Sequence, residues 1–315
     1  MNQKQTENIP VMVVGSLNLD LVATADRLPV TGETVFGREF ATFPGGKGGN
    51  QAVAAGKLGA KVTMVGCVGQ DAFAQELITS LKQNNVDTAY VRKVDTSTGT
   101  ALITVGASGA NTIVVVAGAN AYCSKADVDK ALKSFAKPGI LLVQHEIPPE
   151  TVQYAIKVAK EAGWTVILNP APACAISEQT LALVDIITPN ETEAAVITGC
   201  QVNSPVEAIT AGKKLLSLGV KAVVVTLGSL GAICITANEI VQVPSITVEA
   251  VDTTAAGDAY TGALAAALSE GRELKDSLQF AAVAAGLSVT RRGAQPALPW
   301  RREVDQYISQ LEVSK

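Results

Sequence analysis

The chain has 315 residues, which is enough for a sizeable hydrophobic core in one or two domains. Hydrophobic residues make up 48% and charged residues 17% of it, so the chain is expected to be globular and not disordered. Its net charge of −4 argues against nucleic-acid binding, which favours a basic surface. No apolar run approaches the roughly 20 residues of a membrane span, and the polar N-terminus lacks an apolar signal core. We therefore expect a cytoplasmic protein that binds neither nucleic acid nor membranes.

The cysteines and the single histidine exclude several kinds of site. The five cysteines are dispersed and form no Cys-x-x-Cys pair, which indicates reduced and mostly buried thiols. Because His145 is the one histidine, a histidine-rich metal site is excluded, and base chemistry is expected to come from a carboxylate. Strand alternation would turn His145 away from Glu146, which favours a structural or site-edge role for it.

Short apolar, β-branched runs alternate with alanine-rich segments of helical character along most of the chain. Continuously apolar strands joined by helices predict a parallel α/β sheet with helices on both faces. In such a sheet, ligands bind beyond the carboxyl ends of the strands. The expected strands are 11–15, 61–66, 139–144, 164–169, 184–188 and 221–228, and the expected helices lie near 48–59, 71–85, 125–136, 149–163, 191–198 and 204–218.

Two regions interrupt this alternation. Residues 16–44 lack a good helical pattern, and residues 98–117 contain two β-rich runs around a Gly/Ser/Asn turn, which indicates a hairpin. We expect these strands to lie outside the main sheet as a small β-layer that covers the site. Two buried helices are expected near the C-terminus. No repeat or linker is visible, so we expect one domain over 1–315 with a β-lid inserted at about 16–45 and 96–118.

The stretch "PGGKGGNQ", at 44–51, precedes an apolar, alanine-rich run. It fails the phosphate-loop pattern because Lys47 is followed by Gly48 and not by Ser or Thr, and no dinucleotide fingerprint follows the first strand. Its four glycines allow close backbone approach or flexibility, while Lys47 and Asn50 offer directional donors. The alternative is a tight turn before a helix.

A second cluster of small residues, "VDTTAAGDAYTG" at 251–262, leads into another apolar helix. The backbone amides of Ala255, Ala256 and Gly257 would be open at the helix N-terminus, where they and the helix dipole suit an anion. Asp258 would then be placed to take a proton from a hydroxyl that attacks a phosphoryl group. Its alternative role is to stabilise the helix N-terminus by about 0.3–1 kcal/mol.

Polar residues also follow two of the predicted strands near the middle of the chain. In "TPNETE", Asn190 and Glu193 suit metal-bound water and phosphate oxygens, or alternatively begin a helix. The glycine-rich turn "TLGSLG", at 226–231, suits a nucleotide that lies against backbone, although many turns have this composition. These segments are candidates for a nucleotide site.

Three further side chains are suited to hydroxyl groups. Asn18 and Asp20 share one face of an extended segment because they are two residues apart. Glu146 follows an apolar strand. All three could bind a polyol.

In combination, these motifs resemble the ribokinase (PfkB) family of carbohydrate kinases over about residues 10–305. "GGKGGNQAVAA" is similar to the family's N-terminal signature and "DTTAAGDAYTGAL" to its C-terminal one. Their co-occurrence with "NPAPA", "TPNETEA" and "VTRRGAQPALPW" is far more specific than any single motif. The resemblance implies a ribokinase-like fold with a small β-sheet lid. It also implies ATP-dependent phosphorylation of D-ribose to D-ribose 5-phosphate.

The resemblance further implies roles for individual residues. Asp258 would deprotonate the primary hydroxyl of the sugar, and Ala255, Ala256 and Gly257 would form the anion hole. The positions that match sugar contacts are Asn18, Asp20, Gly46, Lys47, Gly48, Gly49, Asn50, Glu146 and Asp258. The positions that match the ATP site are Asn190, Thr226, Leu227, Gly228, Ser229, Leu230, Gly231, Gly257 and Asp258. Magnesium and phosphate would be ordered by Asn190 and Glu193.

The resemblance also implies activation by a monovalent cation, usually K⁺, and a homodimer formed through the lid. Ala297 departs from the family, where a hydroxyl residue is common. Ala282 departs where larger polar residues can lie near the nucleotide, and Gly49 stands where alanine is usual. The positions that match the cation site are Asp252, Thr254, Ser288, Arg291, Gly293 and Ala297.

Two alternative functions remain at this point. A kinase of the same fold could act on deoxyribose, another sugar or a nucleoside, because one hydroxyl more or less is invisible in the sequence. A non-catalytic sugar-binding regulator would need a broken base or anion hole, whereas "AAGD" is intact.

Overall fold

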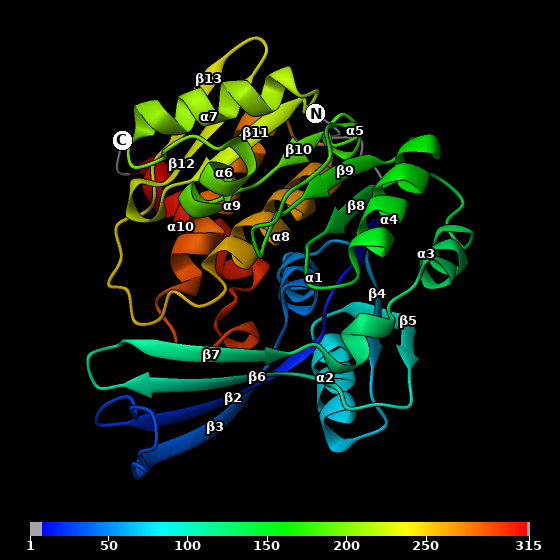
Figure 1. Cartoon of the computed structure of the whole chain (residues 1–315). Helices are drawn as coiled ribbons and strands as arrows, with labels where there is room; N and C mark the ends of the chain where they lie inside the picture. Colours follow the sequence, from blue (N-terminus) through cyan, green and yellow to red (C-terminus); the bar gives the residue numbers. More distant parts are fainter. Residues whose placement is uncertain (1–7, 314–315) are drawn as a thin grey trace.

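The computed structural model describes residues 8–313. The described elements form a nine-stranded central sheet between two layers of helices, and a four-stranded sheet that projects beyond them (Figure 1). The strand order of the central sheet is β13-β12-β11-β10-β9-β8-β1-β4-β5. The doubly covered, mostly parallel architecture expected from the sequence is thus confirmed.

The six expected strands of the central sheet are all present and pair in parallel. Two features were not expected: the edge strand β5, in which only Val86 is buried, and the antiparallel pair β12–β13 at the other edge. The edge strands β5 and β13 lack the continuous burial that makes parallel strands visible in a sequence, whereas β12 is internal and buried over four residues. The strands are β1 (Val11–Val14), β4 (Val62–Val68), β5 (Val86–Lys93), β8 (Ile140–Val143), β9 (Thr165–Leu168), β10 (Ile186–Ile187), β11 (Ala222–Thr226), β12 (Ala232–Thr236) and β13 (Ile240–Val243).

The helices cover both faces of the central sheet. In β1, Val11 and Val13 pack into the hydrophobic cluster with α1, α8 and α9, whereas Met12 and Val14 pack into the cluster with α3, α4 and α7. The helices are α1 (Lys47–Lys57), α2 (Ala72–Gln83), α3 (Lys125–Leu132), α4 (Pro149–Glu161), α5 (Glu178–Leu181), α6 (Glu191–Thr198), α7 (Pro205–Ser217), α8 (Ala256–Ser269), α9 (Leu274–Ser288) and α10 (Arg301–Val313), with 3₁₀ turns η1 (Gly118–Tyr122), η2 (Gly228–Leu230) and η3 (Gln295–Ala297).

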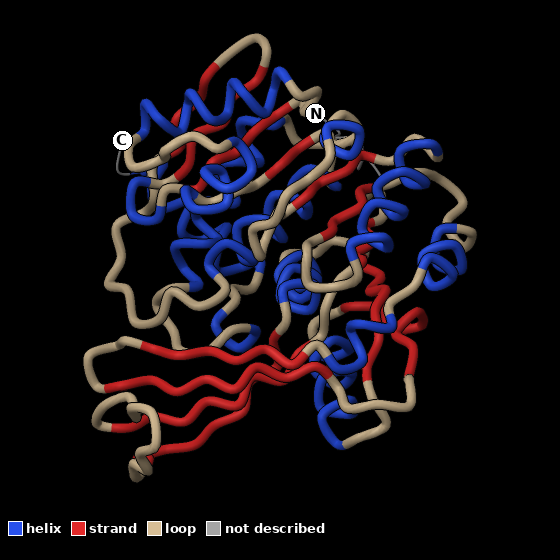
Figure 2. Tube along the Cα trace, in the orientation of Figure 1, coloured by secondary structure: helices blue, strands red, loops and turns tan. Residues whose placement is uncertain are grey.

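The second sheet is built from the two regions that interrupt the α/β alternation. It contains β2 (Asn18–Ala25), β3 (Gly37–Gly45), β6 (Gly99–Gly106) and β7 (Asn111–Val116), in the order β3-β2-β6-β7. The expected hairpin is β6–β7, and β6 also pairs in parallel with β2. Figure 2 shows this sheet extending as a separate layer from the body of the molecule.

Other expectations about the chain concern its cysteines and membrane spans. The five cysteines are free, and Cys67, Cys123 and Cys234 are buried, as the sequence indicated. Across residues 8–313, no helix has the length and apolar character needed to cross a membrane. Within the same residues, no group of three or more histidine, cysteine and acidic side chains could hold a metal ion.

Candidate active site

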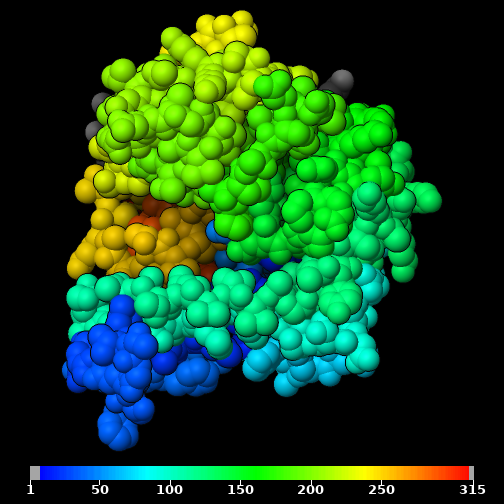
Figure 3. Space-filling view, viewed as in Figure 1, coloured from blue at the N-terminus to red at the C-terminus, as the bar shows by residue number. Residues whose placement is uncertain are grey.

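Polar residues gather where the parallel strands of the central sheet end. The chain passes from β1 through Ser16 into β2, leaves β8 at Gln144, and leaves β9 at Asn169. Hydrogen bonds join these ends to α1, and α1 to the first turn of α8. In Figure 3 the surface is hollowed between the four-stranded sheet and the body, and chain from both the N-terminal strands and the C-terminal helices shows there.

The start of α1 lies against the segment between β1 and β2. Gly46 precedes the helix with φ of 81°, a left-handed conformation that favours glycine. A Cβ at Gly46 would lie 2.6 Å from the backbone nitrogen of Asn18, and one at Gly48 would lie 2.6 Å from that of Ser16. Gly49 is less constrained, because its nearest neighbours at 3.0 Å are side-chain atoms. Close backbone approach therefore explains Gly46 and Gly48.

Lys47 begins α1 and lies among four carboxylates. Its backbone amide donates to Oε2 of Glu146 at 3.0 Å, and Oγ of Ser16 donates to the same oxygen at 2.5 Å. Burial lowers the pKa of the Lys47 ammonium, but the surrounding negative charges outweigh that effect and raise the pKa. Lys47 is therefore held as a cation at the centre of the cluster. The four carboxylates belong to Asp20, Glu146, Glu193 and Asp258.

Asp20, on β2, has an unusual carboxyl group. Burial is the main cause that raises the pKa of Asp20 to about 7, and repulsion from Glu146 and Asp258 adds to it. The charge of Lys47 acts in the opposite direction. A Cβ at Gly45 would lie 2.4 Å from Oδ2 of Asp20, so the neighbouring glycine leaves room for this side chain. Near neutral pH, Asp20 can donate or accept a hydrogen bond.

Asp258 lies buried in the first turn of α8 between two amide donors. Nδ2 of Asn50 donates to Oδ2, and Nε2 of Gln51 donates to Oδ1, each at 2.9 Å. Burial raises the pKa of Asp258, and the charge of Lys47 with these two hydrogen bonds opposes the rise in part. Oδ1 of Asn50 is buried and finds no partner among the described residues. It is an acceptor that a ligand hydroxyl could satisfy.

Asn18 is held by Asn120, a residue that the sequence did not single out. Oδ1 of Asn120 accepts from the amide of Leu17 at 2.8 Å, and its Nδ2 donates to the carbonyl of Leu17 at 3.2 Å. The same Nδ2 donates to Oδ1 of Asn18 at 2.7 Å, which fixes the orientation of that amide. Asn120 is 102 residues from Asn18, in the turn that follows the four-stranded sheet, so no local pattern could have found it.

The N-terminus of α8 is more open than that of α1. Ala255 precedes the helix in the left-handed conformation, with φ of 61°, which is unusual for a residue other than glycine. A Cβ at Gly257 would meet no atom within 4 Å among the described residues. The amide of Ala256 donates to the carbonyl of Thr253 at 3.2 Å. An anion held as the sequence predicts would require that amide to change partners.

Asn190 and Glu193 form a capping box at the start of α6. The amide of Glu193 donates to Oδ1 of Asn190 at 2.8 Å, and the amide of Asn190 donates to Oε2 of Glu193 at 2.9 Å. The helix-start alternative is therefore present in the structure. The pair also borders the site, because the charges of Lys47 and Asp258 act on Glu193, whose pKa is raised mainly by burial.

The glycine-rich turn after β11 lies beside this helix start. Thr226 and Asn190 form a parallel bridge, and the turn continues through η2 with φ of 54° at Gly228 and 91° at Gly231. A cavity of about 750 Å³ adjoins it. Among the residues predicted for ATP, Leu227 and Leu230 line this cavity, together with α6 and the connection to α7. Ser229 lies within η2.

The residues predicted for a monovalent cation are brought together only in part. Asp252 accepts from the amides of Thr254 and Gly293, each at 2.9 Å, and so joins two loops. Burial raises the pKa of Asp252, but these hydrogen bonds outweigh it and lower the pKa.

The other residues predicted for the cation have partners elsewhere. Ser288 donates to the carbonyl of Ala285, and Arg291 pairs with Glu303. Ala297 is buried in η3 and offers no side-chain oxygen.

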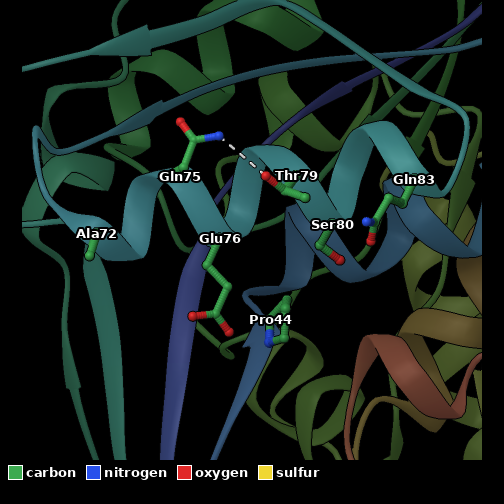
Figure 4. A pocket seen from close by; sticks show the side chains of 7 residues that line it. All are labelled: Pro44, Ala72, Gln75, Glu76, Thr79, Ser80 and Gln83. Atoms are coloured by element: carbon green, nitrogen blue, oxygen red, sulfur yellow. Dashed lines mark hydrogen bonds between the residues drawn. The ribbon is translucent and has the colours of Figure 1, made fainter.

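Three other features border the site or lie outside it. His145 contacts Sγ of Cys174 at 3.1 Å through Nδ1, and burial lowers its pKa. Ala282 is buried in α9. An open groove of about 600 Å³ runs along α2 and Pro44 (Figure 4). Its described lining includes none of the predicted site residues.

The sequence of this chain is similar to those of known carbohydrate kinases. The sequence profile of the pfkB family carbohydrate kinases matches residues 8–301. The chain is 42% identical to a ribokinase of Bacillus subtilis over 300 residues, which covers 95% of this chain and 99% of the relative. It is 38% identical over 301 residues to a deoxyribokinase of Salmonella typhi, which covers 95% and 98% of the two chains.

A solved structure of similar shape agrees with the sequence relatives. The structure of Arabidopsis thaliana ribokinase complexed with ribose and ATP superposes with a TM-score of 0.87 and 36% identity, and covers 95% of this chain and 98% of that one. The fold and the sequence relatives are those of a carbohydrate kinase. This chain belongs to the pfkB family of carbohydrate kinases.

Proposed function

We propose that this protein transfers the γ-phosphoryl group of ATP to the 5-hydroxyl of D-ribose and forms D-ribose 5-phosphate. The observation that carries the proposal is the buried Asp258 carboxylate, which two amide donors hold beside Lys47 at the edge of the sheet. Family membership and the similarity to a ribokinase solved with ribose and ATP support the same reaction.

The sugar would lie against α1 and β2. The side chains of Asn18, Asp20 and Asn50 offer donors and acceptors to hydroxyl groups, and the unsatisfied Oδ1 of Asn50 supports binding at this place. Lys47 and Glu146 would complete the contacts. In this proposal Gly46 and Gly48 bring α1 close to the segment that carries Asn18, and the amide of Gly49 donates to the carbonyl of Ser16 in that segment.

Asp258 would act as the general base for the attacking hydroxyl. The attack would be in line with the leaving group, and the amides of Ala255, Ala256 and Gly257 would face the negative charge of the transferring group. The open space at Gly257 supports a ligand there. ATP would lie along Thr226–Gly231, near Asn190.

Two metal ions are part of the proposal. Mg²⁺ bound with ATP would neutralise charge on the phosphates, and the amide and carboxylate oxygens of Asn190 and Glu193 are hard donors that fit it through water. K⁺ would lie near Asp252, whose lowered pKa keeps its carboxylate ionised at neutral pH. Replacing K⁺ by a large organic cation should lower kcat, and an unchanged rate would contradict this site.

We also propose that the four-stranded sheet closes over the sugar as a lid and forms a homodimer. Strand β7 exposes four consecutive apolar side chains, Ile113 to Val116. Such a stripe on an outer strand would be covered in a dimer. Light scattering at micromolar concentration should give twice the mass of the chain, and a monomer would contradict this part of the proposal.

The function is tested by ADP release and by one substitution. With ATP and Mg²⁺, ribose should give the highest kcat/KM in a panel of sugars and nucleosides at equal concentration. Deoxyribose is the second candidate, since a deoxyribokinase is 38% identical to this chain.

The Asp258→Asn protein should fold normally and lose roughly 10²–10⁴-fold in kcat. Near-wild-type turnover would reject Asp258 as the base, and sugar binding without ADP release would indicate a non-catalytic regulator.

A further inference from the structure

Buried amides form a continuous hydrogen-bonded chain beside Asp258. Nε2 of Gln144 donates to Oε1 of Gln51 at 2.6 Å. Nε2 of Gln51 donates both to Oδ1 of Asp258 at 2.9 Å and to Oδ1 of Asn169 at 3.0 Å. Nδ2 of Asn169 donates to the carbonyl of Thr188 at 3.0 Å. Gln51 and Gln144 have no exposed surface, so the chain is enclosed by protein.

The carbonyl of Thr188, at the end of these linked amides, sets the direction of every hydrogen bond among them. The carbonyl of Thr188 can only accept, so Asn169 turns its Nδ2 toward that carbonyl and its Oδ1 toward Gln51. Gln51 must then present Nε2, which leaves its Oε1 for Gln144. As a result, Oδ1 of Asp258 faces an N–H group. The reversed amide would place an oxygen against the carboxylate and leave buried groups unpaired.

The side-chain amides of Asn50 and Gln51, which both donate to Asp258, differ in how many of their hydrogen-bonding groups have partners in the protein. Oδ1 of Asn50 has no partner among the described residues, so this side chain is available to a ligand. Gln51 uses both hydrogens of Nε2 and its Oε1 within the protein. Asn50 can therefore exchange partners when a sugar binds, whereas Gln51 remains in place.

We propose that Gln51 is a positioning residue, which holds the Asp258 carboxyl group in one orientation and favours its ionised form, because the carbonyl of Thr188 fixes the direction of the hydrogen-bonded amides. The inference rests on the proposed function, in which Asp258 is the base. Gln51 does not touch the substrate. It acts through Asp258 alone.

Several groups determine the protonation of Asp258. Burial is the largest influence and raises its pKa, and the hydrogen bond from Gln51 opposes that rise. Loss of the hydrogen bond should therefore raise the pKa further. The charged groups that face Asp258 are Lys47 on α1, Asp20 on β2, Glu146 after β8 and Glu193 on α6.

The test replaces Gln51 by methionine, which has a similar volume and no amide. We expect the acidic limb of the kcat–pH profile of Gln51→Met to move up by about one to two pH units, the size of one lost hydrogen bond to a charged group. Below the limb, kcat should fall roughly 10–100-fold at fixed pH. The KM for ATP should stay within a factor of two to three. A uniform loss of kcat with an unmoved limb would overturn the proposal.

Two further variants separate positioning from general loss of stability. Gln144→Met removes the outer donor but leaves Gln51 in contact with Asp258, so the limb should move in the same direction by less. Thr151→Val removes a buried hydrogen bond to the carbonyl of Cys123 and should leave the limb in place. Equal shifts in Thr151→Val and Gln51→Met would contradict a specific role for Gln51.

A direct titration keeps this inference separate from the proposed function. In protein labelled with ¹³Cγ aspartate, the Asp258 resonance is assigned by its loss in Asp258→Asn. Its midpoint should lie at higher pH in Gln51→Met than in the wild type, and coincident midpoints would refute the role of Gln51. If the wild type releases no ADP with any sugar, the proposed function fails, while this titration still decides whether Gln51 acts on Asp258.

Discussion

Two helices of this protein begin with small residues at the same edge of the sheet, and they do so for opposite reasons. At the start of α1, a Cβ on Gly46 or Gly48 would collide with backbone 2.6 Å away. At the start of α8, a Cβ on Gly257 would meet no described atom within 4 Å. The first segment is filled by the protein itself, whereas the second leaves space for a ligand.

The difference separates two ways of building a binding site. On the α1 side, the absence of side chains lets backbone segments approach, and the side chains of Asn50 and Gln51 then reach Asp258. On the α8 side, the absence of side chains leaves backbone amides accessible at a helix N-terminus. Directional groups suit a sugar, and amides without side chains suit a phosphoryl group.

The largest expected effect comes from a substitution at the start of α1, where Gly46 and Gly48 lie against backbone (the filled side). Gly46→Ala would introduce a Cβ 2.6 Å from the backbone nitrogen of Asn18 at a φ of 81°. Backbone strain and overpacking together should lower the free energy of unfolding by about 2–6 kcal/mol. Urea unfolding measures this loss. Gly49→Ala is the matched control, because its nearest neighbours are side-chain atoms that can shift, and it should cost much less.

At the start of α8, where Gly257 has open space (the open side), an added methyl group should raise stability and lower activity. Gly257→Ala adds a methyl group where the protein has room, within the first turn of a helix, so stability should rise by up to about 1 kcal/mol. The same methyl group would displace the phosphoryl group in the proposed site and lower kcat by up to roughly 10²-fold. Thermal unfolding and ADP release test the two parts. Unchanged kcat in a stable Gly257→Ala protein would show that no ligand approaches Gly257.

The sequence predicted the repeating part of the fold, and several residues that it singled out for the site lie close together in the structure. Parallel strands are visible because they are continuously apolar, as in β1 and β8, and the hairpin β6–β7 is marked by its turn. The edge strands β5 and β13 lack that signature, whereas β12 has it and was still not predicted. The sequence also could not decide why each glycine is present, because the atoms opposite a glycine come from distant segments.

The same limit applies to residues that act through others. Gln51 stands inside a recognisable motif, yet its partners Gln144, Asn169 and Asp258 come from three other segments of the chain. Asn120 has no motif at all. Asn190 and Glu193 carried two predictions, a helix start and a phosphate site. The structure contains the helix start, and the phosphate site stays a prediction.

Asp20 lies beside the start of α1, where burial disfavours the ionised form of its carboxyl group. Its pKa is raised from 3.8 to about 7, so the folded protein binds this proton more tightly than the unfolded chain does. Stability present below pH 4 is therefore lost as the pH rises toward 7. Asp20→Asn should be more stable than the wild type by up to about 4 kcal/mol at pH 8, since each pKa unit is worth about 1.4 kcal/mol, and nearly equal near pH 4. A pH-independent difference in urea unfolding would contradict the raised pKa.

The smallest expected effect concerns the link between the four-stranded sheet and the filled side. Asn120→Ala removes the donor that fixes Oδ1 of Asn18 and both contacts to the backbone of Leu17. In the proposed function Asn18 contacts the sugar, so the KM for the sugar should rise about 5–10-fold, the size of one hydrogen bond. The open side should be unaffected, and the KM for ATP should stay within a factor of two. Equal increases in both KM values would mean that Asn120 supports the whole site and not the sugar side alone.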